Sequence, residues 1–79
     1  MSDHIPDLLY RALEHKAQAN IDEAEATLEI YFSNPVAIGE HPQHLDEMTK
    51  LLDTIAMNED RLDILMKNFS DYNESKGNT

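Results

Sequence analysis

The chain has 79 residues, which is enough for one domain whose core is near the lower limit for independent stability. The absence of cysteine excludes disulfide bridges and thiolate metal sites. With 16 acidic and 6 basic residues the net charge is −10, which disfavours direct binding to nucleic acid or to an anionic membrane. No apolar run approaches the ~20 residues that a membrane span needs, and residues 1–10 do not resemble a signal peptide, so we expect a cytoplasmic protein.

The first predicted element is a helix over residues 6–33. Apolar side chains recur there at spacings of three and four, the period of one face of an α-helix. Pro6 suits the first turn, and Asn34 ends the helix because the residue before a proline is driven out of the helical region. The predicted apolar stripe comprises Tyr10, Leu13, Ala17, Ile21, Ala24, Leu28 and Tyr31.

The connection over residues 34–41 is half apolar. Two interpretations are open for its side chains Val36 and Ile38. They cover the end of the helical core, or they form a docking loop for another protein, because exposed apolar loops are uncommon without a partner.

The second predicted helix covers residues 42–69 and begins at Pro42. Its apolar residues alternate at spacings of three and four, which is typical of a helix in a coiled coil or bundle. They are Leu45, Met48, Leu52, Ile55, Leu62, Met66 and Phe69, and Glu59 interrupts them as a polar core position. Leu51, Ile64 and Leu65 widen the stripe and are candidate partner-binding residues. Residues 70–79 are polar and predicted to be a disordered tail.

Two helices of similar length joined by a short connection run antiparallel when they touch. The sequence therefore predicts an all-α helical hairpin as a single domain over residues 1–69. Its core is small and rich in alanine, so we expect a homodimer that forms a four-helix bundle, or a hairpin that completes its core on a foreign helix. Glu59 is predicted to set the register of the helices, by pairing with Lys16 or Arg11.

No arrangement of residues indicates catalysis. His41, His44 and Glu47 have helical spacing for a metal site, but no fourth ligand is evident, and His41 has an ordinary role as a helix cap. The serines lie at element ends or in the tail, and no glycine-rich phosphate loop is present. We therefore expect no enzyme activity, no cofactor and no metal.

Residues 34–45 read Asn-Pro-Val-Ala-Ile-Gly-Glu-His-Pro-Gln-His-Leu, and Leu-Leu-Asp-Thr-Ile-Ala follows at 51–56 and Glu-Asp-Arg-Leu at 59–62. Over about residues 20–69 the chain resembles small acidic proteins of unknown function from tailed bacteriophages, including T4-like myoviruses. The resemblance implies a viral protein in a bacterial cytoplasm and no particular activity. A recurring connection would favour docking by Val36, Ile38 and His41.

These observations predict a small non-catalytic interaction protein that binds a host or viral protein. The alternative is an acidic mimic of nucleic acid that inhibits a DNA- or RNA-binding protein, since carboxylates can occupy a basic cleft. Its acidity has a simpler explanation, because net charge also keeps a small protein soluble.

Overall fold

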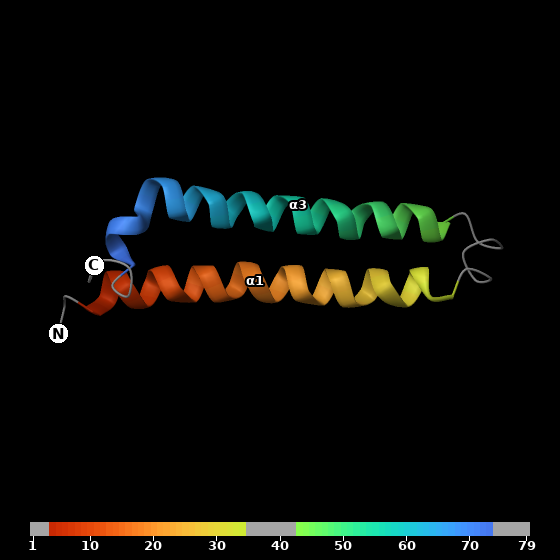
Figure 1. Ribbon diagram of the computed structural model, residues 1–79, viewed down its shortest axis with the longest axis horizontal. Helices are drawn as coiled ribbons and strands as arrows, with labels where there is room; N and C mark the ends of the chain where they lie inside the picture. The colour runs from red at the N-terminus through yellow and green to blue at the C-terminus, as the bar shows by residue number, and fades with distance from the viewer. Residues whose placement is uncertain (1–3, 35–42, 74–79) are drawn as a thin grey trace.

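The computed structural model describes residues 4–34 and 43–73. Two long helices, α1 (His4–Phe32) and α3 (Gln43–Phe69), lie side by side and antiparallel, and a short 3₁₀ helix, η1 (Ser70–Tyr72), follows (Figure 1). The molecule is a rod of 55 × 21 × 18 Å, and its described residues form no strand. The predicted all-α hairpin is confirmed. Neither described helix is long and apolar enough to cross a membrane.

α1 ends with a tightened turn. The amide of Ser33 still donates to the Glu29 carbonyl at 2.9 Å, whereas that of Asn34 donates to Tyr31 at 3.2 Å, three residues back. The Ser33 hydroxyl donates to the carbonyl of Ile30 at 3.0 Å. These bonds satisfy carbonyl groups that have no partner further along the helix.

The face of α1 toward α3 carries five buried apolar side chains. They are Tyr10, Ala17, Ile21, Ala24 and Leu28. Small alanine side chains, each 3% exposed, leave room for α3 to approach closely. Leu13 departs from the predicted stripe, because the half-buried Glu14 takes the heptad position and Leu13 is 55% exposed.

The face of α3 toward α1 is displaced from the predicted one. Met48, Ile55 and Leu62 lie in it as predicted, since Met48 is buried and the other two are half-buried. At four other predicted positions of the stripe the prediction is wrong, because there the residue one place earlier in the sequence faces α1. The observed row is His44, Met48, Leu51, Ile55, Asn58, Leu62 and Leu65, whereas Leu45, Leu52, Glu59 and Met66 are exposed.

A polar core position does exist, but it is Asn58 and not Glu59. Glu59 is exposed, so its predicted place in the core is wrong. Asn58 is 1% exposed, and its Oδ1 accepts hydrogen bonds from Asn20 Nδ2 at 3.0 Å and from Arg61 Nη1 at 3.2 Å. Its Nδ2 donates to the Thr54 carbonyl at 2.7 Å, so the amide is satisfied on both sides.

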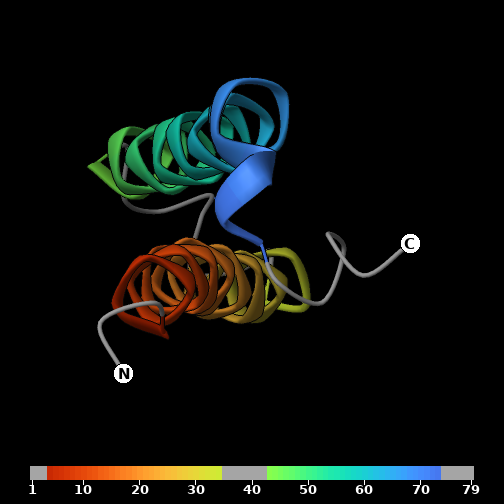
Figure 2. The ribbon, with the colours of Figure 1, turned by 90° about the vertical axis from the view of Figure 1, so that its left-hand side faces the viewer.

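The end of the hairpin opposite the connection is closed by η1. Ser70–Tyr72 form one 3₁₀ turn that bends from α3 toward the start of α1 (Figure 2). The prediction of disorder from residue 70 is therefore wrong for this turn. Residues 74–79 lie outside the described residues, as do Val36, Ile38 and His41, so both interpretations of the connection stay predictions.

Candidate interaction surfaces

A groove runs between the two helices near the chain termini. Its first part, about 280 Å³, is almost wholly apolar and lies between the start of α1 and the end of α3. The second part, about 320 Å³, continues along the same side and shares Leu13 and Leu65 with the first. We call the two parts together the terminal groove. Its apolar lining is Pro6, Leu9, Tyr10, Leu13, Ala17, Ile64, Leu65, Phe69 and Tyr72.

Large apolar side chains of this groove face solvent. Leu9 is 60% exposed, Leu13 55% and Tyr72 51%. Side chains of this size normally mark a contact surface when they gather in one place. The groove is therefore a candidate site for a protein partner.

Two cations border the groove without a carboxylate partner. Lys16 and Arg61 line its second part, and neither has a carboxylate oxygen within 4.0 Å among the described residues. Arg61 instead donates to Asn58 and, through Nη2 at 3.4 Å, to the sulfur of Met57. In a chain of net charge −10 this edge of the groove is locally cationic.

The remaining described lysines and arginine are paired along their own helices. Arg11 lies 3.6 Å from Asp7, and Lys67 lies 2.9 Å from Asp63. The hydrogen bond from Lys67 to Asp63, followed by their charge attraction, raises the pKa of Lys67 above its ordinary value of 10.5. These i,i+4 pairs are local and leave the groove cations as the available ones.

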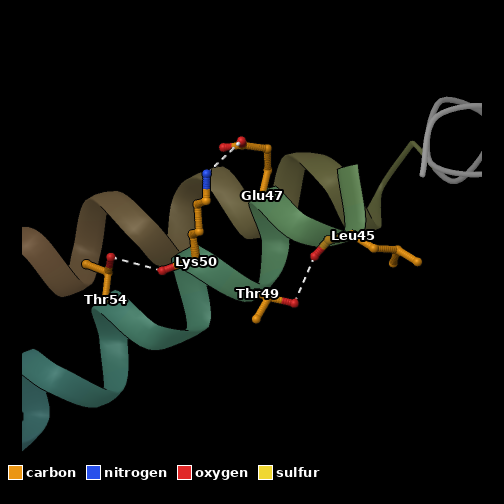
Figure 3. Close-up of polar contacts among 5 residues, drawn as sticks. All are labelled: Leu45, Glu47, Thr49, Lys50 and Thr54. Atoms are coloured by element: carbon orange, nitrogen blue, oxygen red, sulfur yellow. Dashed lines mark hydrogen bonds and ion pairs between the residues drawn. The ribbon is translucent and has the colours of Figure 1, made fainter. Parts of the chain in front are cut away.

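A second apolar surface lies along α3, outside its contact with α1. Leu45, Leu52 and Met66 are between 53% and 57% exposed and share one heptad row. Figure 3 shows the first turns of this helix, where the hydroxyls of Thr49 and Thr54 turn back onto carbonyl groups of their own helix. We call the side chains of Leu45, Leu52 and Met66 the outer row.

The predicted partner-binding residues have different surroundings. Ile64 is 42% exposed and lines the terminal groove, and half-buried Leu65 lies at the junction of its two parts. Leu51 is half-buried in the row that faces α1. Leu9 is not among the predicted partner-binding residues, although its spacing of four from Leu13 is a helical signal.

His44 packs against Tyr31, with ring centroids 5.3 Å apart and planes at 59°. This contact gives His44 a place in the core between the helices. No three His, Asp or Glu residues of the described ranges are grouped so that they could hold a metal ion, and His41 lies outside those ranges.

No protein-family model, curated protein or solved structure matches this chain. The two apolar surfaces and the distribution of charge are therefore the features of this chain that bear on its function.

Proposed function

We propose that this chain is a small non-catalytic interaction protein that binds other protein through the exposed faces of its helices. The observation that carries the proposal is the amount of large apolar surface left outside the hairpin. Thirteen large apolar side chains of the described residues are 42% to 68% exposed, and those of the terminal groove gather between the two helices. Grouped apolar side chains of this kind characterise contact surfaces.

Self-association into a four-helix bundle is part of this proposal. Among the described residues the hairpin buries six apolar side chains, and two of them are alanines. The whole chain exposes 5984 Å², roughly a fifth more than the ~4,900 Å² expected for a compact monomer of 9.0 kDa. A standard interface removes ~800 Å² from each partner, and two elongated hairpins that pack side by side can remove area on this scale.

The setting that we propose is a bacterial cytoplasm during phage infection, with a host or viral protein as a further partner. The resemblance of residues 34–45 to phage proteins supports this setting. A hairpin that uses one face for itself retains its outer row, or its connection, for that partner.

An acidic mimic of nucleic acid is the second candidate, and one feature of α1 favours it. Asp22, Glu25 and Glu29 follow one another at spacings of three and four, all exposed, with no base after Lys16 in α1. On α3 the acids are mixed with cations, for example in the 3.6 Å pair of Lys50 with Glu47 (Figure 3). The carboxylate row is therefore limited to one helix.

The two candidates are separated by paired baits in affinity capture from a phage-infected host lysate. The baits are the wild type, a Leu45→Asp/Leu52→Asp variant, and a variant in which Asp22, Glu25 and Glu29 become Asn or Gln. A partner lost with the leucine variant alone supports helix-face binding. A partner lost with the amide variant alone supports mimicry. A wild-type bait that captures nothing specific and is monomeric at all concentrations refutes the interaction proposal.

A further inference from the structure

We infer that the terminal groove is where a second copy of this chain docks, with a two-fold axis perpendicular to the helices and crossing α1 between Leu9 and Leu13. This inference rests on the proposed self-association and adds the face, the symmetry and the contacting charges. Both parts of the groove face the same side of the hairpin and share Leu13 and Leu65, so a flat helical surface can cover them together.

Both helices contribute apolar side chains to the terminal groove. Leu9 and Leu13 come from α1, and Ile64 and Phe69 come from α3. A two-helix face of this kind matches another two-helix face, which is the packing of a four-helix bundle. The outer row has apolar side chains from α3 alone, and it fits a single helix better than a second hairpin.

Charge is divided unequally along the rod, and this division selects the symmetry. The half with the connection, residues 17–34 and 43–58, holds seven acids and one base, a net charge of −6. The half with the groove, residues 4–16 and 59–73, holds six acids and four bases, a net charge of −2. A two-fold axis parallel to the helices would bring the two −6 halves together, whereas a perpendicular axis sends them to opposite ends.

The perpendicular axis also gives the groove cations acidic neighbours. With the axis between Leu9 and Leu13, Leu9 of each copy lies opposite Leu13 of the other. At this level the axis passes α3 near Met66, midway in sequence between Arg61 and Asp71 of the following turn η1, so it brings Arg61 of one copy toward Asp71 of the other. Asp71 is exposed and Arg61 has no carboxylate within 4.0 Å among the described residues, so both are available for this pair.

The first experiment measures the dimer dissociation constant by light scattering and sedimentation for the full chain at ~0.15 M salt, where surface charges are partly screened. Leu52→Asp is the matched control for Leu13→Asp, because the two leucines are almost equally exposed in the single hairpin, Leu13 at 55% and Leu52 at 56%. We expect Leu13→Asp to weaken the dimer by about 100-fold or more, since each dimer loses the contact twice. Leu52→Asp changes it less than about threefold. Circular dichroism establishes that both variants remain helical.

The second experiment exchanges the charges across the interface. Arg61→Asp alone and Asp71→Arg alone each weaken the dimer, by about fivefold. The double variant Arg61→Asp/Asp71→Arg restores it to within about threefold of the wild type, because both pairs are remade with opposite polarity. Such a rescue requires that the two residues meet between copies.

The possible results separate the inference from the proposed function. Dimer loss with Leu52→Asp instead of Leu13→Asp overturns the groove as the interface and leaves self-association in place. If Leu13→Asp weakens the dimer as expected but the double variant Arg61→Asp/Asp71→Arg does not restore it, the perpendicular axis is overturned. A wild type that is monomeric at every concentration overturns the inference together with the proposed four-helix bundle.

Discussion

Replacing Asn58 by alanine tests whether a buried amide joins the two helices. The Asn58 side chain is 1% exposed and accepts a 3.0 Å hydrogen bond from Asn20 on the opposite helix. Loss of that bond costs about 1 kcal/mol, and the small cavity left by the amide adds up to about 1 kcal/mol. We therefore expect the free energy of unfolding to fall by about 1–2 kcal/mol, with a fall in Tm of roughly 5–15 °C.

The assay is a double-mutant cycle with Asn58→Ala and Asn20→Ala, followed by urea and thermal unfolding at one fixed protein concentration. Because each single change removes the same bond, the coupling energy is expected to be about 1 kcal/mol. Glu59→Ala is the matched control, since Glu59 is exposed beside Asn58, and it should change stability by less than about 0.5 kcal/mol. A coupling energy near zero, or a larger loss from Glu59→Ala than from Asn58→Ala, would refute the assignment of Asn58 as the polar core position.

Two other predictions concern packing and pH. Ala24→Leu adds volume where α1 meets α3, at a side chain that is 3% exposed, and should lower the free energy of unfolding by about 1–3 kcal/mol, whereas Ala26→Leu on the exposed face should leave it nearly unchanged. Equal effects in denaturant unfolding would contradict the assigned face. Because the pKa of Lys67 is raised in the folded protein by Asp63, its contribution to stability is present below pH 10.5 and is lost as the pH rises through the folded-state pKa. A Lys67→Met variant should therefore lose less stability than the wild type on titration above about pH 10, as measured by unfolding at each pH.

The second helix shows why its contact face could not be read from apolar spacing. Met48, Ile55 and Leu62 belong to two possible heptad rows, one completed by 45, 52, 59 and 66 and the other by 44, 51, 58 and 65. The first set reads Leu, Leu, Glu and Met, and the second His, Leu, Asn and Leu, so apolarity selects the first. The structure uses the second, because Asn58 finds Asn20 across the interface and His44 packs on Tyr31.

Apolar spacing could not predict the terminal groove either. Leu9 and Leu13 have the spacing of a helical face, and Ile64 and Phe69 are apolar, but these pairs are more than 50 residues apart in the chain. Their position on one side of the rod depends on the register of α1 against α3, which local periodicity does not contain. Tyr72 joins them because η1 continues the ordered chain past Phe69.

The sequence by itself determined two long helices, the proline-marked connection between them, and the antiparallel hairpin, because these follow from local periodicity, backbone restriction and chain length. It also determined the acidity and the absence of cysteine. The tertiary structure alone decided which row of α3 is covered, which polar residue lies in the core, and where apolar side chains remain exposed. Those outcomes depend on hydrogen bonds and packing between residues far apart in the chain, where a satisfied asparagine is an acceptable core residue and a leucine can remain in solvent.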